Sequence, residues 1–258
     1  MDRRSFRTLP VVFLVLLLTS IPVYAWGGCD HRADRSGKVS AEGVSRIEIE
    51  ARAGDLDVRA GTGNEVAARG VACAEKSRRL DDIRLVTERR GDVVRVIVEM
   101  PETRGWNDSV SLDLDVEVPA DVPVEIQDSS GDLDVRGVHL TRLDDSSGDI
   151  NVRDTTGELR VDDSSGDVDL TGHHGFVRLD DSSGDLRIRD IDGSVLVDND
   201  SSGNISVHHV SGSVTVRRDS SGDIRVSDIG GDFEVGRDGS GDIDYRDVRG
   251  RVDVPTDD

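Results

Sequence analysis

From residue 128 onward, aliphatic residues alternate with charged or polar residues in short runs that are separated by glycine turns. In the segment 183–200, SGDLRIRDIDGSVLVDND, Leu186 and Ile188 alternate with charged residues, and Val195 and Val197 do so again after Gly193. Alternation with a period of two over about five residues is typical of a β-strand with one buried face. Each such segment therefore predicts two short strands.

The segment recurs seven times along the chain. Its glycines are spaced by 17, 18, 18, 19, 19 and 19 residues, at Gly131, Gly148, Gly166, Gly184, Gly203, Gly222 and Gly241. Single coils with such short strands cannot bury a core, but stacked coils place each aliphatic on its equivalent about 4.8 Å away. The pattern predicts an all-β fold: a parallel β-solenoid, right-handed like most strand crossovers, with two short strands per coil of 17–19 residues.

The predicted core has two walls and a corner. One wall consists of Leu133, Ile150, Val168, Leu186, Ile205, Ile224 and Ile243. The facing wall consists of Leu159, Val177, Val195, Val214, Phe233 and Val252. A third core column closes the edge between the walls and consists of Val138, Thr155, His173, Ile191, Val210, Ile229 and Val248. Aromatic residues make up only 3% of the chain, which fits a narrow interior filled by branched aliphatics.

Less regular alternation precedes the coils. Residues 39–127 predict an irregular N-terminal β region of the same solenoid, with a short helix or loop at 73–83, and residues 128–258 predict the regular seven-coil part. Residues 26–38 lack the alternation and predict an N-terminal linker.

The N-terminus predicts export. Residues 1–25 combine basic residues, an apolar run from Leu9 to Leu18 and small residues before the expected cut after Ala25, which is typical of a secretory signal peptide. A cut before Cys29 with lipid attachment is the alternative. The mature chain would have no transmembrane segment and would lie in the periplasm or at the cell surface. Cys29 and Cys73 are the two cysteines, and an oxidising compartment predicts a disulfide between them.

The charge of the chain restricts its partners. With 53 acidic and 32 basic residues the net charge is −21, and loss of residues 1–25, which hold one acid and three bases, makes it −21 − 2 = −23. Such a charge repels nucleic acid and favours cationic partners.

The repeated units carry a family resemblance. IEIEARAGDLDV at 47–58, the turn VPADVPVEI at 118–126 and the repeated SSGDIxV and GxVxV units resemble the bacterial putative-adhesin family of extracytoplasmic β-strand-repeat proteins, a domain of unknown function. The resemblance covers roughly residues 39–254. It implies a β-solenoid in the cell envelope, linked to adhesion or envelope stress, and supplies no catalytic residues.

Two aspartate columns flank each DSSGD turn. The first, at the corner, consists of Asp128, Asp145, Asp163, Asp181, Asp200, Asp219 and Asp238, and we expect it to form structural Asx turns. The second, the ridge, consists of Asp132, Asp149, Asp167, Asp185, Asp223 and Asp242, with Asn204 in the remaining coil. The ridge is the candidate metal site.

The ridge carboxylates should face solvent and repel one another, so they need compensation. The arginine column that contains Arg136, Arg153, Arg189 and Arg246 lies about 13 Å along the strands, too far for direct pairing. Calcium, which prefers oxygen ligands, is the candidate cofactor for the ridge. Screened surface acid without bound metal is the alternative.

No catalytic constellation stands out. The serines and aspartates repeat uniformly, whereas an active site normally interrupts a repeat at one place. We expect loop or surface roles for His31, His139, His173, His174, His208 and His209. The main hypothesis is an exported, non-enzymatic solenoid that presents a structural, adhesin-like or binding surface to an envelope protein or glycan. The alternatives are an acidic binder of cationic envelope-active peptides or divalent cations in a stress response, and a carbohydrate-active β-helix enzyme.

Overall fold

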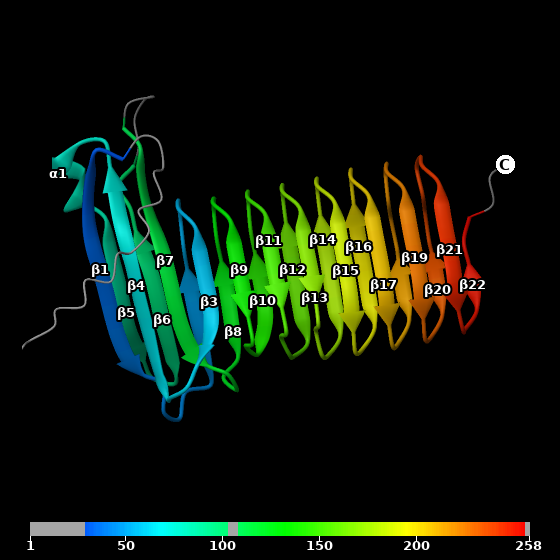
Figure 1. The fold of residues 1–258 in the computed structure, drawn as a ribbon, viewed down its shortest axis with the longest axis horizontal. Helices are drawn as coiled ribbons and strands as arrows, with labels where there is room; N and C mark the ends of the chain where they lie inside the picture. The colour runs from blue at the N-terminus through cyan, green and yellow to red at the C-terminus, as the bar shows by residue number, and fades with distance from the viewer. Residues whose placement is uncertain (1–28, 103–107, 256–258) are drawn as a thin grey trace, which may run out of the picture.

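Two β-sheets run the length of the molecule and form a rod, with parallel strands except at the N-terminal end. The computed structural model describes residues 29–102 and 108–255, which form two 11-stranded sheets (Figure 1). Sheet A contains, in spatial order, β1 (His31–Ser40), β4 (Glu65–Ala74), β7 (Val110–Pro119), β3 (Leu56–Gly61), β9 (Leu133–Arg136), β11 (Ile150–Arg153), β13 (Val168–Thr171), β15 (Leu186–Ile191), β17 (Ile205–Val210), β19 (Ile224–Ile229) and β21 (Ile243–Val248).

Sheet B faces sheet A across the core. It contains, in spatial order, β22 (Val252–Asp253), β20 (Phe233–Val235), β18 (Val214–Val216), β16 (Val195–Asp200), β14 (Val177–Asp181), β12 (Leu159–Asp163), β10 (Leu140–Asp144), β8 (Val124–Gln127), β2 (Arg46–Glu50), β6 (Val93–Glu99) and β5 (Arg84–Arg90). The predicted parallel β-solenoid is confirmed.

The predicted stacking register is also confirmed. Leu186 pairs with Val168 on one side and with Ile205 on the other, and Val195 likewise pairs with Val177 and Val214. From Leu133 to Ile224 and from Leu159 to Phe233, the two walls are at most 2% exposed. Each fully buried aliphatic of this size stabilises the fold by about 1.5–3 kcal/mol before the entropy cost of ordering the chain.

The N-terminal coils do not follow the order of the sequence. Strands β2 and β3 form the first coil in the chain, yet they lie between the β6–β7 and β8–β9 coils, because β2 pairs with both β6 and β8 and β3 pairs with both β7 and β9. Residues 39–127 and the regular coils thus share the same two sheets. The chain passes outward to build the end of the rod and then returns to continue the stack.

The linker prediction is wrong for residues 31–38, because His31–Ser40 forms strand β1. This strand pairs antiparallel with β4 over ten residue pairs, from His31 with Ala74 to Ser40 with Glu65. Its sequence, HRADRSGKVS, has no hydrophobic alternation from which a strand could be predicted, and none of its residues is fully buried. Its order comes from main-chain hydrogen bonds to β4 and from the Cys29–Cys73 disulfide, which closes the sheet edge just before it (Cα–Cα distance 5.6 Å).

One other element at this end follows the prediction. The short helix α1 (Ser77–Leu80) lies within the predicted helix or loop at 73–83. Strand β5 pairs antiparallel with β6, so that β1 and β5 form the N-terminal edges of the two sheets. In the described part of the chain, no helix has the length and apolar character needed to cross a membrane. The predicted signal peptide at 1–25 lies outside the described residues.

Candidate functional site

The corner aspartates lie at the turns through which the chain passes from sheet B to sheet A. Asp163, Asp181 and Asp200 are the last residues of β12, β14 and β16, and the next sheet A strand begins five residues later. Although they are charged residues next to a turn, six members of the column are only 0–5% exposed: Asp128, Asp145, Asp163, Asp181, Asp200 and Asp219. Their side chains thus point into the end of the core, beside the aliphatic walls.

In five of the corner aspartates, one carboxylate oxygen holds the turn. Oδ1 of Asp163 accepts the backbone N–H groups of Ser164 and Ser165 at 2.7 and 3.2 Å. The equivalent Oδ1 accepts a serine N–H at Asp128, Asp181, Asp200 and Asp219. These bonds have the form of the predicted Asx turn and satisfy donors that the change of direction would leave unpaired.

The second carboxylate oxygen is different. Oδ2 of Asp128, Asp163, Asp181, Asp200 and Asp219 is buried and has no hydrogen-bond partner among the described residues. Burial, the main cause, raises the pKa of Asp128, Asp163 and Asp200 to about 7 and the pKa of Asp181 and Asp219 to about 6, from an ordinary value of 3.8. Burial also raises the pKa of Asp145.

Neighbouring corner carboxylates add to this effect. The charge of Asp181 raises the pKa of Asp163, and the charge of Asp219 raises that of Asp200. Two unit charges separated by the strand spacing of about 4.8 Å repel by about 3.5 kcal/mol at an effective dielectric constant of about 20. A fully ionised corner column would therefore oppose folding.

The glycine between the two columns allows the coils to stack tightly. At Gly184, with φ 134°, an added Cβ would lie 1.7 Å from the carbonyl oxygen of Gly166 in the preceding coil. The second serine of the turn then ties the coils together, because Ser183 Oγ donates to the carbonyl of Ser164 at 3.2 Å. The DSSGD sequence thus combines a buried acceptor, a coil-to-coil hydroxyl bond and a residue without a side chain.

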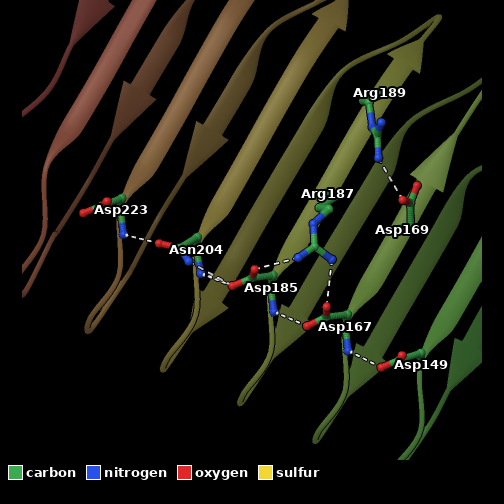
Figure 2. Close-up of polar contacts among 8 residues, drawn as sticks. All are labelled: Asp149, Asp167, Asp169, Asp185, Arg187, Arg189, Asn204 and Asp223. Atoms are coloured by element: carbon green, nitrogen blue, oxygen red, sulfur yellow. Dashed lines mark hydrogen bonds and ion pairs between the residues drawn. The ribbon is translucent and has the colours of Figure 1, made fainter.

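The ridge aspartates form a hydrogen-bonded ladder on the outer face of sheet A. Figure 2 shows that Oδ1 of Asp149 accepts the N–H of Asp167, whose own Oδ1 accepts the N–H of Asp185, at 3.0 and 2.9 Å. The ladder continues through Asn204, whose side-chain oxygen accepts the N–H of Asp223. Because an amide oxygen accepts the same bond, the single asparagine leaves the ladder unbroken.

The compensation for the ridge charge was missed in the sequence. Arg187 bridges two coils, with Nη1 2.8 Å from Asp167 and Nη2 2.7 Å from Asp185 (Figure 2). The Arg187 hydrogen bond lowers the pKa of Asp167, and the N–H of Asp242 lowers that of Asp223. The signal was present at the alternate position of the strand, two residues after the ridge, where Arg187 and Arg225 point to the same face as the ridge.

The arginine column considered in the sequence pairs elsewhere, as its distance from the ridge predicted. Arg153 lies 3.1 Å from Asp134, and Arg189 lies 2.8 Å from Asp169. Both pairs join adjacent coils across the middle of the outer face, and both are half-exposed. Such pairs add little stability, typically less than about 1 kcal/mol each.

Calcium binding by the ridge remains a prediction, and the geometry argues against it. Within residues 29–102 and 108–255, no three His, Cys, Asp or Glu side chains converge to hold a metal ion. The ridge oxygens that a cation would need are already engaged by backbone N–H groups or arginines at most coils.

The surface role expected for all histidines is wrong for His173. This side chain is 0% exposed, and its ring lies in the predicted third core column, with Thr155 and Ile191. Its Nε2–H donates to the carbonyl of Gly157 at 3.0 Å, and Nδ1 lies 2.9 Å from Thr155 Oγ1. Burial lowers its pKa, so the ring is a neutral, satisfied core residue.

Among the described hydrogen bonds, one joins an exposed histidine to a serine hydroxyl, which is the pair that a serine hydrolase needs. His208 Nδ1 lies 2.9 Å from Ser227 Oγ on the open outer face of sheet A. The neighbouring His209 instead pairs with Asp190 at 2.7 Å. A hydrolytic triad needs an acid that orients the histidine, and no described carboxylate bonds to His208.

An acidic groove lies at the N-terminal end of sheet A, where β7, β3 and β9 are adjacent. It has a volume of about 690 Å³, and Val71, which is 38% exposed, lies beside its charged residues. Two arginines, Arg35 and Arg69, line it together with seven aspartates: Asp34, Asp55, Asp57, Asp113, Asp115, Asp132 and Asp134. Arg59 and Arg136 pair with some of these aspartates. Among the described residues, no Lys or Arg lies within 4.0 Å of Asp55, Asp113 or Asp132, which continue the ridge into the groove.

The fold has relatives among solved structures. A protein of Bacteroides fragilis described as a putative adhesin superposes with a TM-score of 0.50 at 12% identity, over 88% of this chain and 99% of that one. A Parabacteroides distasonis protein described as a putative lipid-binding protein reaches a TM-score of only 0.39 at 14% identity, over 85% and 96%. These identities show the fold alone. No curated protein matches the chain.

Family models give the more direct result. The model described as Toastrack DUF4097 matches residues 38–198, which is 161 of 258 residues and includes both the reordered N-terminal coils and the first regular ones. The chain therefore belongs to the Toastrack DUF4097 family.

Proposed function

We propose that the protein is an exported, non-enzymatic β-solenoid of the bacterial cell envelope that acts as an adhesin-like binding surface. The acidic groove of β7, β3 and β9 is its contact site, and a cationic segment of a partner protein or peptide is what it binds. Support for export comes from residues 1–25, and support for an adhesin-like role comes from the fold relative described as an adhesin. The uniform repeats, without an inserted cleft-forming loop, support a non-enzymatic role.

The observation that carries the groove assignment is that Asp55, Asp113 and Asp132 have no direct ion pair with a described lysine or arginine. Along the middle of the rod, Arg187 pairs directly with Asp167 and Asp185, whereas no described lysine or arginine lies within 4.0 Å of the three groove carboxylates, although Arg35 and Arg69 also line the groove. Exposed Val71 adds an apolar contact beside the charges. A lysine or arginine side chain places an aliphatic stem and a charged head in one ligand, which fits both features.

Binding of a fluorescent oligolysine peptide tests the assignment. The triple variant Asp55→Asn/Asp113→Asn/Asp132→Asn should raise the Kd about tenfold, which corresponds to about 1.4 kcal/mol. The matched control is Asp154→Asn/Asp228→Asn/Asp247→Asn, which removes the same charge at left-handed corners that asparagine tolerates. Equal weakening by both variants would show attraction to net charge alone and would overturn the groove assignment.

Two further measurements test the remaining parts of the proposal. Fractionation of cells that express the full chain should recover it in the envelope or periplasm, and a cytoplasmic product would contradict export. Incubation with envelope polysaccharides should give no turnover, and a catalytic rate that survives purification would contradict the non-enzymatic role.

A further inference from the structure

The corner column leaves buried carboxylate oxygens without partners in coil after coil. Five aspartates have an Oδ2 that no described polar group contacts, and their side chains are at most 5% exposed: Asp128, Asp163, Asp181, Asp200 and Asp219. An ionised carboxylate in such a place loses its hydration and gains only the bonds that Oδ1 makes. One such group would be a local cost, but here the arrangement repeats along the rod.

The charges around the column do not neutralise it. The groups that act on these aspartates are themselves carboxylates. Asp145 and Asp55 act on Asp128, and Asp181 and Asp145 act on Asp163. Asp180 and Asp167 act on Asp181. Asp219 and Asp181 act on Asp200, and Asp238 acts on Asp219. They come from sheet B, from the ridge of sheet A and from the column itself. Among the described residues, none of these aspartates has an ion pair with lysine, arginine or histidine.

We propose that the corner column is a proton-binding ladder: the folded rod takes up protons on the unpartnered oxygens, so that mild acid stabilises it and alkaline medium loosens it. A proton removes the buried charge while Oδ1 keeps its bond to the serine N–H. Protonation also reduces the repulsion between successive coils, so each proton favours the stacking on which the rod depends. This inference does not rest on the groove or on its partner.

The direction of the pH effect follows from proton linkage. The pKa values of about 6 to 7 in the folded protein lie above the ordinary 3.8. The folded state therefore binds more protons than the unfolded state between about pH 4 and 7. The resulting stabilisation is fully present below about pH 4, and it is lost as the pH rises through 6 to 7. Stability should fall across neutrality, where most proteins change little.

Thermal melting at constant ionic strength tests the ladder. The Tm of the whole protein should be at least about 5 °C higher at pH 5.5 than at pH 8. In the variant Asp163→Asn/Asp181→Asn/Asp200→Asn, each amide oxygen can accept the serine N–H but no group titrates. This variant should melt above wild type at pH 8 and should lose at least half of the pH difference.

The matched control is Asp132→Asn/Asp149→Asn/Asp242→Asn on the ridge, where Asn204 shows that an amide fits. It removes the same charge at the equivalent turns of other coils and should keep the wild-type pH difference. Equal loss of the pH difference in both variants would overturn the ladder, and so would a wild-type Tm that is flat or rises between pH 5.5 and 8.

A measurement on unmutated protein covers the case in which the triple variant does not fold. Infrared difference spectra of folded wild type between pH 5.5 and 8 should show a protonated carboxylic acid band that disappears with a midpoint between pH 6 and 7. Absence of that band at pH 5.5 would overturn the proposal. Failure of peptide binding to the groove would leave this band unchanged, so the two proposals fail separately.

Discussion

The two aspartate columns contain the same residue type four positions apart and have opposite electrostatics. Asp181 ends a sheet B strand with its side chain turned into the core, and burial raises its pKa to about 6. Asp167 immediately precedes the sheet A strand β13 with its side chain turned outward, and Arg187 lowers its pKa. The comparison shows that the direction of the side chain relative to the sheet decides the role of a carboxylate. Turned inward, the ionised group destabilises the fold because it is buried, and turned outward it is a solvated hydrogen-bond acceptor.

Both columns nevertheless use Oδ1 in a similar way. At the corner it accepts N–H groups of the same turn, and on the ridge it accepts the N–H of the next coil. The columns differ in what happens to Oδ2, which is isolated at the corner and reaches arginine or solvent on the ridge. Experiments that alter one column at a time can therefore separate the turn-forming role from the charge.

The largest effect should come from the glycine that separates the two columns. Gly184→Ala would place a Cβ 1.7 Å from the Gly166 carbonyl and at φ 134°, so the coils must move apart. We expect a loss of more than about 4 kcal/mol in the free energy of unfolding, measured by denaturant titration. Gly91→Ala is the control, because its Cβ meets nothing within 4 Å at φ 67°. It should cost only about 1 kcal/mol, and similar losses in both would refute the stacking argument.

A smaller effect should distinguish turn formation at the corner from hydrogen bonding on the ridge. At pH 5.5, where the corner carboxyl is largely neutral, Asp200→Ala leaves the partly buried N–H of Ser202 without its acceptor and should cost about 1–3 kcal/mol. Asp149→Ala removes the acceptor of an exposed N–H that water can replace, and should cost less than about 1 kcal/mol. Equal costs by chemical denaturation would show that burial does not separate the columns.

A shift in Tm on strong acidification should reveal the ridge. The lowered pKa values of Asp167 and Asp223 mean that their contribution is present above the ordinary 3.8 and is lost as the pH falls through the lowered values. The Tm should therefore pass through a maximum between about pH 4 and 6 and fall at lower pH. Calorimetry that shows a Tm still rising down to pH 2.5 would contradict this assignment.

The smallest effect should come from the bridging arginine. Arg187→Gln removes the cation between Asp167 and Asp185 and should lower the free energy of unfolding by about 0.5 kcal/mol, because the pair is partly exposed. The loss should shrink in about 0.5 M salt, where charges are screened within a few ångströms. A loss that does not change with salt would mean that Arg187 acts through its aliphatic stem instead.

The regular coils could be predicted from the sequence almost residue by residue. Strict alternation and the 17–19-residue period fix which side chains face inward, so the columns from Leu133 and Leu159 agree with the observed register. The turn role of the corner aspartates followed from the same alignment. Strand β1 escaped prediction because an edge strand held by main-chain bonds needs no apolar alternation.

The candidate groove could not be predicted for a related reason. Asp113, Asp55 and Asp132 are distant in the chain, and they become neighbours only because β3 is inserted between β7 and β9. Strand order at this end depends on which strand edges are free to pair, and the local alternation of residues does not reveal which distant strand will pair with which. The charges could be counted in advance, but their gathering into one surface could not.

The sequence by itself determined the solenoid, its period, its core columns and the turn at every corner, because each of these depends on residues close together in one repeat. Only the tertiary structure decided the electrostatic state of the aspartates and the order of the N-terminal coils. Burial, a missing partner for Oδ2 and the approach of Arg187 are properties of stacked neighbours. The energy of a charge depends on everything within a few ångströms of it, and stacking brings together residues that the chain keeps apart.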